Sequence, residues 1–218
     1  MANIELVIFD LDGTLLDTIE DLGDSVNEVL RQRQFPEHSY RDYREYIGDG
    51  MEMLIRRALP GAVASDPEVV AEVLADYQVA YGRNWNNKSR PYDGIPECLD
   101  RLTQKGLQLA VLSNKPDHFT RLCVSELLPG IDFAMVCGDR EGIARKPDPG
   151  GALAIAGQIG VDAERTLFAG DSNVDITTAV SAGMVPVGVL WGFRAEDELR
   201  AAGALHLVSK PDEIVDLA

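Results

Sequence analysis

The stretch that most constrains this chain is the apolar run Ile4–Phe9, which ends directly on two acidic residues. A short, largely β-branched run of this kind is typical of a central parallel strand that is buried on both faces. Asp10 and Asp12 lie one pleat repeat apart, so both carboxylates can point the same way, and Gly13 permits a sharp turn. Two carboxylates there are costly unless a cation or a proton compensates them, so the stretch predicts a functional site.

The rest of the chain changes pattern twice, and these changes predict the fold class. From residue 17 to 89 apolar residues recur at helical spacing and no strand candidate is found. From residue 90 onward strand-like runs at 107–112, 133–136, 166–169, 185–190 and 205–208 alternate with helical patterns. Such alternation favours a doubly wound parallel α/β sheet. We therefore expect an α/β core domain made of residues 1–16 and 90–218, with an inserted all-helical cap domain over 17–89.

The overall charge and the cysteine content limit the partners and the compartment. The 218 residues carry a net charge of −16, which argues against nucleic acid and anionic membranes as partners. The sequence has no basic leader and no apolar stretch of membrane length, so neither a signal peptide nor a membrane span is predicted. Three cysteines, an odd number, lie in apolar runs, as expected for reduced core residues of a cytoplasmic protein.

Polar clusters follow several of the predicted strands. In sequence order they are Asp10 with Asp12, Ser113 with Asn114, Lys146, and Asp171 with Asp175. Ligands of doubly wound sheets bind outside the carboxyl ends of the strands, so these clusters are expected to share one edge. Carboxylate oxygens suit Mg²⁺, whereas a lysine, a hydroxyl and helix N–H groups suit a phosphate. The combination predicts phosphoryl transfer.

Four motifs in this order, FDLDGTLLD, LSNKP, KPDP and GDSNVD, resemble those of the haloacid dehalogenase superfamily. Within it the chain most resembles bacterial phosphoglycolate phosphatases, and the resemblance spans the whole sequence. It implies a Rossmann-like core with a helical cap, Mg²⁺ as cofactor and a small phosphomonoester as substrate. A cytoplasmic monomer or homodimer is expected.

The resemblance also implies roles for individual residues. Asp10 is implied as the nucleophile that forms an aspartyl-phosphate, and Asp12 as the general acid and then the general base. Lys146 is implied to neutralise phosphoryl charge and to hold Asp10. Substrate-binding positions are implied for Thr14, which supports the loop, for Ser113 and for Asn114. Mg²⁺ is expected on Asp10, the backbone carbonyl of Asp12 and Asp171, with Asp175 in support. A β-hairpin flap is expected around residues 15–18.

The predicted cap contains one candidate for substrate contact. Gly48, Asp49 and Gly50 lead into an amphipathic helix that starts near Met51. Glycines let the backbone approach a ligand, and the first N–H groups of the helix could meet an anion. Arg56 and Arg57 either form a solvated helix face or include one residue that meets the substrate.

Other functions remain possible from the sequence. The substrate could be pyrophosphate or a sugar phosphate instead of 2-phosphoglycolate. A phosphosugar mutase is disfavoured because those relatives usually carry a different residue at the position of Thr14. A dehalogenase is disfavoured because dehalogenases lack an acidic residue at the position of Asp12. A receiver-type signalling module would be shorter and uncapped. A binding protein without catalysis should have lost one of four residues that are all present here: Asp10, Asp12, Lys146 and Asp171.

Overall fold

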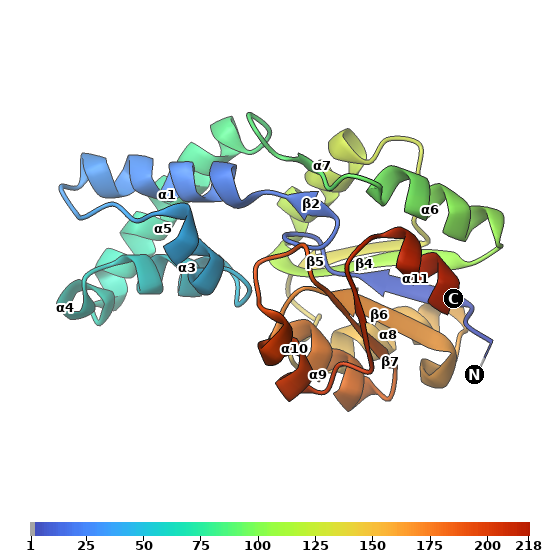
Figure 1. Cartoon of the computed structure of the whole chain (residues 1–218). Coiled ribbons are helices and arrows are strands. Elements are labelled where there is room, and N and C mark those ends of the chain that lie inside the picture. Colours follow the sequence, from blue (N-terminus) through green and yellow to red (C-terminus); the bar gives the residue numbers. More distant parts are fainter. Residues whose placement is uncertain (1–2) are drawn as a thin grey trace. The chain divides into compact units, whose positions relative to one another are not determined.

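The computed structural model describes residues 3–218 of the chain (Figure 1). The chain divides into two compact units. One unit comprises the residues up to Leu16 together with Pro91–Ala218, and the other comprises Asp17–Arg90.

The first unit is an α/β structure built on a parallel sheet. Six strands of the described chain form this sheet in the order β5-β4-β1-β6-β7-β8, and all of their pairings are parallel. The strands are β1 (Leu6–Phe9), β4 (Gln108–Pro116), β5 (Met135–Asp139), β6 (Thr166–Gly170), β7 (Val185–Val189) and β8 (His206–Val208). The predicted doubly wound fold class is therefore confirmed.

The helices of this unit precede or connect its strands, except the last helix, which follows β8. They are α6 (Ile95–Gln104), α7 (Asp117–Leu127), α8 (Gly150–Ile159), α9 (Asn173–Ala182), α10 (Glu196–Ala202) and α11 (Asp212–Leu217), with a short 3₁₀ turn at Ala163–Arg165. Helix α6 packs against α11 on one side of the sheet, and α8 packs against α9 on the other (Figure 1). The core on the α8 and α9 side includes Ile8, Leu112, Ile155, Phe168 and Ala179.

Strand β1 lies at the centre of the sheet, and all four of its residues are fully buried. Its last residue, Phe9, is aligned with Val111 of β4 on one side and with Ala169 of β6 on the other. The strand order reverses at β1, and in doubly wound sheets ligands bind at such a reversal. The fold therefore brings the residues that follow β1 and β6 to one edge.

The second unit is mainly helical. Its helices are α1 (Ile19–Gln32), α2 (Tyr40–Tyr46), α3 (Met51–Ala58), α4 (Gly61–Ala64) and α5 (Pro67–Asn84). Helices α1 and α5 pack against each other and bury side chains such as Leu22, Val26, Val73 and Tyr77. Asp66 caps α5 by accepting hydrogen bonds from the N–H groups of Glu68 and Val69.

Several local features differ from the sequence-based expectations. Within residues 17–89 only Asp17 lies in a strand, because β2 (Leu16–Asp17) pairs with β3 (Arg90–Pro91) where the chain leaves and re-enters the α/β unit. Near the expected flap, Asp12 and Leu16 form an isolated bridge. Strand β4 continues through Pro116, beyond the predicted end at residue 112. Helices α2, α10 and α11 are short and rich in polar residues, so their apolar periodicity is weak. No helix within residues 3–218 is long and apolar enough to cross a membrane.

Candidate active site

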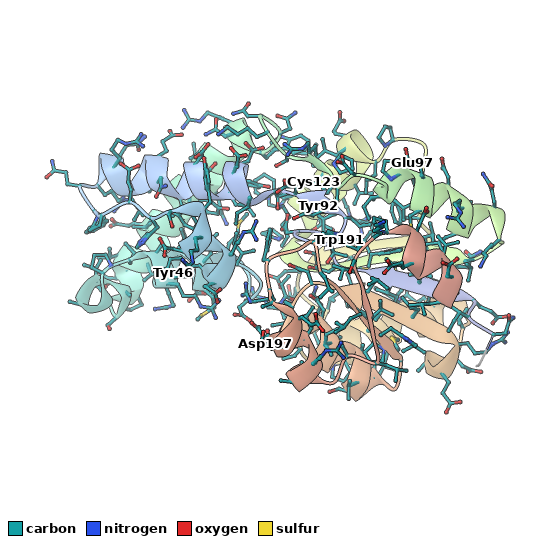
Figure 2. All side chains as sticks on the ribbon, in the orientation of Figure 1. Tyr46, Tyr92, Glu97, Cys123, Trp191 and Asp197 are labelled. Carbon is teal, nitrogen blue, oxygen red and sulfur yellow. The ribbon has the colours of Figure 1, made fainter. Side chains whose placement is uncertain are left out.

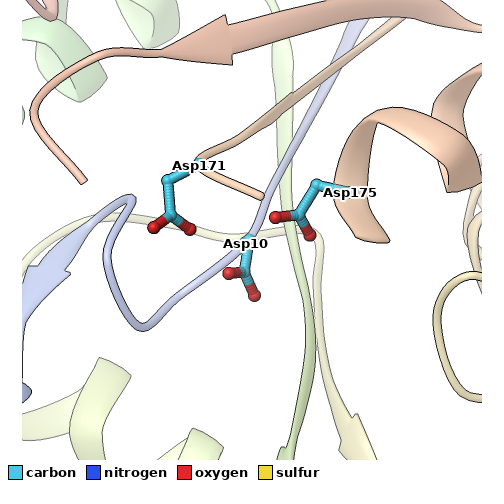
Figure 3. Close-up of side chains that lie close together, drawn as sticks. All are labelled: Asp10, Asp171 and Asp175. Carbon is cyan, nitrogen blue, oxygen red and sulfur yellow. The ribbon is translucent and has the colours of Figure 1, made fainter. Parts of the chain in front are cut away.

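Three buried carboxylates face one another at the carboxyl edge of the sheet (Figure 3). Asp10 follows β1, Asp171 follows β6, and Asp175 lies in the first turn of α9. Each offers one oxygen, and these oxygens lie within 4.8 Å of one another. The three residues are only 8%, 2% and 1% exposed, respectively. The structure thus brings together three of the acids that the sequence singled out.

Lys146 joins two of these acids. Its ammonium nitrogen lies 2.6 Å from Oδ1 of Asp10 and 2.6 Å from Oδ1 of Asp175. The side-chain amide of Asn114 fixes the main chain of Lys146, because it accepts a hydrogen bond from the Lys146 N–H and donates one to the Lys146 carbonyl. Asn114 therefore supports Lys146, a role that the sequence did not indicate.

Asp12 pairs with a second buried lysine, which sequence reasoning missed. The ammonium of Lys115 lies 2.9 Å from Oδ1 and 3.1 Å from Oδ2 of Asp12. Lys115 is in the extended end of β4, two residues after Ser113. Alternate residues of a strand share a face, so a longer predicted strand would have placed Lys115 beside Ser113.

The remaining predicted residues of the α/β unit support this cluster. The Thr14 hydroxyl donates a 3.4 Å hydrogen bond to Oδ1 of Asp171 and is fully buried. The Ser113 hydroxyl is also buried and accepts a 3.2 Å hydrogen bond from the N–H of Lys115. Both side chains thus lie among the acids and lysines of this edge.

The loop after β7 also contacts the cluster, and sequence reasoning did not predict this contact. Trp191, labelled in Figure 2, donates from its indole Nε1 to the Thr14 carbonyl at 2.9 Å. The N–H of Phe193 donates a 2.7 Å hydrogen bond to Oδ2 of Asp171. Gly192 lies so close that a Cβ there would be 2.2 Å from the Cβ of Asp171. Gly13, with φ of +91°, is equally close, because a Cβ there would lie 2.3 Å from Oδ2 of Asp171. These contacts fix the Asp171 carboxylate.

Burial and mutual repulsion raise the proton affinity of the acids. Burial, and next the charge of Asp175, raise the pKa of Asp10 to about 7, although Lys146 acts in the opposite direction. Burial and the charges of Asp175 and Asp10 raise the pKa of Asp171 well above its usual value, against the Phe193 N–H and the Arg194 charge. Burial alone would lower the pKa of Lys146, but Asp10 and Asp175 outweigh it and raise that pKa.

The donor set fits a divalent cation. Four carboxylates (Asp10, Asp12, Asp171 and Asp175) lie with two ammonium groups (Lys115 and Lys146), which leaves two excess negative charges when all are ionised. Clustered carboxylate oxygens are ligands of hard divalent cations. Burial first, and then this repulsion among the acids, raise the pKa values of Asp10 and Asp171, and a bound cation would favour their ionised forms.

The predicted cap residues Gly48, Asp49 and Gly50 lie in the helical unit, just before α3. Asp49 accepts a hydrogen bond from Arg57, which also donates to the Tyr46 carbonyl at 2.9 Å. Arg56 donates to the Glu52 carboxylate and to the Ala64 carbonyl. Both arginines thus have partners inside the helical unit, and the acidic cluster draws on the α/β unit alone.

Comparisons with known proteins identify several relatives of this chain. The family model "Haloacid dehalogenase-like hydrolase" matches residues 7–189. A phosphoglycolate phosphatase of Haemophilus influenzae is 33% identical over 222 residues, which is 99% of this chain and 95% of the relative. One of Pseudomonas putida is 32% identical over 191 residues, 86% of this chain and 70% of the relative. A solved structure from Lactobacillus delbrueckii subsp. bulgaricus matches with a TM-score of 0.92 at 30% identity, covering 99% of this chain and 98% of that one.

Proposed function

Because the chain belongs to the haloacid dehalogenase-like hydrolase family and is a phosphatase like its relatives, we propose that it hydrolyses a small phosphomonoester through an aspartyl-phosphate. One observation carries this proposal. A carboxylate at the carboxyl end of the central strand, Asp10, is paired with a buried lysine and lies within metal-binding range of Asp171 and Asp175. Phosphoryl transfer needs a nucleophile, a bound cation and a positive side chain that compensates phosphoryl charge, all at one site.

The proposed reaction has two steps. In the first, an Asp10 oxygen attacks phosphorus, the bond from phosphorus to the ester oxygen breaks, and Asp12 gives its proton to that oxygen. In the second, water attacks the phosphorus of the aspartyl-phosphate, the bond from phosphorus to the Asp10 oxygen breaks, and Asp12 takes up a proton from that water. Inorganic phosphate leaves, and both aspartates return to their starting state.

The other residues serve binding and charge compensation. Lys146 holds Asp10 and offsets the negative charge of the phosphoryl group, and Ser113 donates to a phosphoryl oxygen. Asp10, the carbonyl of Asp12 and Asp171 would hold a divalent cation, and Asp175 would support them. We propose Mg²⁺ for this role, because it prefers a few carboxylates and retains several waters. When bound, it supplies charge that stabilises the oxygens of the transferred phosphoryl group.

We further propose 2-phosphoglycolate as the substrate, because the relatives reported above are named phosphoglycolate phosphatases. The residues of the α/β unit account for recognition of a phosphoryl group. Recognition of the glycolate part is assigned to the helical unit, with residues 48–50 as the candidate contact. The substrate is a small molecule, which also agrees with a net charge of −16 that disfavours nucleic acid.

A phosphate-release screen tests this assignment. The purified enzyme with Mg²⁺ is given 2-phosphoglycolate, pyrophosphate, several sugar phosphates and para-nitrophenyl phosphate, and kcat/KM is measured for each. The highest kcat/KM is expected for 2-phosphoglycolate. A higher value for pyrophosphate or a sugar phosphate would replace the substrate but keep the chemistry. Failure to release phosphate from all of them would overturn the proposed function.

A further inference from the structure

Lys115 is a buried cation to which the resemblance assigns no role. Its side chain is only 2% exposed, and its ammonium group lies within hydrogen-bonding distance of both oxygens of Asp12. The side chain of Asp12 is 12% exposed. Removing a lysine from water to this extent is unfavourable unless a partner compensates its charge, and the Asp12 carboxylate is that partner.

The backbone around Lys115 is firmly held. Its N–H donates to the Ser113 hydroxyl at 3.2 Å, and its carbonyl accepts a hydrogen bond from the Thr120 hydroxyl at 3.0 Å. Gly138 of β5 packs so closely that a Cβ there would lie 2.6 Å from the Lys115 carbonyl oxygen. The register between β4 and β5 shifts in the same region, between Leu112 and Pro116. The main chain of Lys115 is thus fixed within the sheet, and its side chain is buried.

The two lysines of the site contact different acids. Lys146 contacts Asp10 and Asp175, whereas Lys115 contacts Asp12. Asp12 lies just before the turn at Gly13, and a carboxylate at the start of a turn has several rotamers open to it. A bond from one ammonium group to both of its oxygens selects a single orientation.

We propose that Lys115 is a positioning residue that holds the Asp12 carboxylate in the orientation from which it exchanges protons with the leaving oxygen and with water. This inference rests on the proposed function, because it gives Lys115 a role only through Asp12. Proton transfer needs donor and acceptor within hydrogen-bond reach, so a carboxylate free to rotate would lose rate in both steps.

The test compares two esters that differ in their need for a proton. The alkoxide released from 2-phosphoglycolate needs protonation, whereas para-nitrophenolate is a stable leaving group. Lys115→Met keeps the length of the side chain but removes the ammonium group. We expect it to lower kcat for 2-phosphoglycolate about tenfold or more and kcat for para-nitrophenyl phosphate by much less, with KM nearly unchanged. Lys210→Met is the matched control, because Lys210 is exposed, and both kcat values should stay at the wild-type level.

A double-mutant cycle with Asp12→Asn separates an indirect role from a direct one. If Lys115 acts through Asp12, adding Lys115→Met to Asp12→Asn should change kcat by less than about twofold, because the group it positions is already gone. The double variant also removes both charges of the buried pair, so it remains informative if Lys115→Met alone folds poorly. Folding of each variant is checked by circular dichroism and thermal unfolding.

Four results would decide against the inference. Equal losses from Lys115→Met on both esters would show that Lys115 does not serve leaving-group protonation. An equally large loss in the Asp12→Asn background would assign Lys115 to the phosphoryl group itself. If Asp12→Asn also lowers kcat equally on both esters, Asp12 is not the proton donor, and the proposed mechanism falls together with this inference. If Asp12→Asn lowers kcat much more for 2-phosphoglycolate than for para-nitrophenyl phosphate but Lys115→Met does not, the role of Lys115 is refuted and that of Asp12 stands.

Discussion

The ammonium group of Lys146 lies 2.6 Å from Oδ1 of Asp10, although 136 positions separate the two residues in the chain. The same nitrogen contacts Asp175 at 2.6 Å, so one lysine links the end of β1 to the start of α9. Asn114 of β4 fixes the main chain of Lys146 with two hydrogen bonds. The ends of two neighbouring strands, β1 and β4, and the start of α9 are thereby linked at one point.

Replacing Asp10 with asparagine should abolish turnover and preserve the fold. The amide is nearly the same size, but it is a poor nucleophile and a poor ligand for a hard cation. We expect kcat for 2-phosphoglycolate to fall by more than about a thousandfold. Asp216→Asn, at an exposed position, is the matched control and should keep full activity. Substantial turnover by a folded Asp10→Asn preparation would remove Asp10 from the role of nucleophile.

Removing divalent metal ions should abolish phosphatase activity reversibly. Without a cation the acids repel one another and the substrate, and Lys115 and Lys146 offset only two of the four charges. EDTA is expected to abolish phosphate release, Mg²⁺ to restore it, and Ca²⁺ to inhibit because its larger, looser shell misplaces the phosphate. Mg²⁺ should also raise the melting temperature of the wild-type protein, and much less that of Asp171→Asn. Full activity in metal-free buffer would refute a metal-dependent mechanism.

The metal-free protein should lose stability as the pH rises from about 6 to about 8. Burial raises the pKa of Asp10 from 3.8 to about 7 in the folded chain. Between these two values the folded state binds more protons than the unfolded state, so the free energy of unfolding falls with rising pH. Asp171, whose pKa is also raised, acts in the same direction.

Asp10 alone should account for roughly 1 kcal/mol between about pH 6 and about pH 8. Urea unfolding in EDTA at these two pH values measures the loss, and Asp10→Asn should show a smaller one. Saturating Mg²⁺ should flatten the trend, because a bound cation stabilises the ionised acids. An unfolding free energy that rises over this range, in wild type and variant alike, would contradict the assigned direction.

Gly192→Ala should weaken metal binding more than it weakens the fold. A Cβ at Gly192 would lie 2.2 Å from the Cβ of Asp171 and 2.5 Å from its Oδ2, so the carboxylate must move. We expect the Mg²⁺ concentration for half-maximal activity to rise about tenfold. Gly157→Ala is the matched control, because a Cβ on that part of α8 meets open space and alanine favours helix. Identical Mg²⁺ curves for wild type and Gly192→Ala would show that this contact does not set metal affinity.

The two arginines of α3 offer a matched pair for testing substrate recognition by residues 48–50. Arg57 contacts Asp49, whereas Arg56 contacts Glu52 and the Ala64 carbonyl. Arg57→Ala should loosen Asp49 and lower kcat/KM for 2-phosphoglycolate several-fold more than for para-nitrophenyl phosphate. Arg56→Ala should leave the ratio of the two constants close to the wild-type value. An unchanged ratio in Arg57→Ala would exclude this segment from substrate recognition. Gly50→Val is a poorer probe, because Gly50 has φ of +89° and valine would be strained there.

Sequence reasoning found the parts of this molecule whose signals are local. The apolar run of β1 and the acids that follow it form one continuous signal. Helix starts such as Asp66-Pro67-Glu68 can be predicted from the capping residue and the proline that follows it. The sheet edge then follows from a general rule about parallel strands, so the meeting of Asp10 with Asp171 could be predicted.

What the sequence did not reveal depends on register and on contacts through space. Lys115, which contacts Asp12, lies where β4 continues past Leu112 and its register against β5 shifts, and no residue type predicts such a shift. The bond from the Phe193 N–H to Asp171 involves main chain, which carries no sequence signal at all. Helix α2 has few apolar residues, so its period could not be seen.

The central place of β1 has a consequence for how the chain is synthesised. Leu6 leaves the ribosome early, yet its partners in the sheet, Gln108 and Thr166, emerge much later. The helical unit, in contrast, is one continuous segment, Asp17–Arg90, whose packing partners emerge together. We expect nascent chains that end before Gln108 to carry a formed helical unit and an unpaired, wholly apolar strand. In that interval β1 is the natural target for chaperones that bind extended apolar segments.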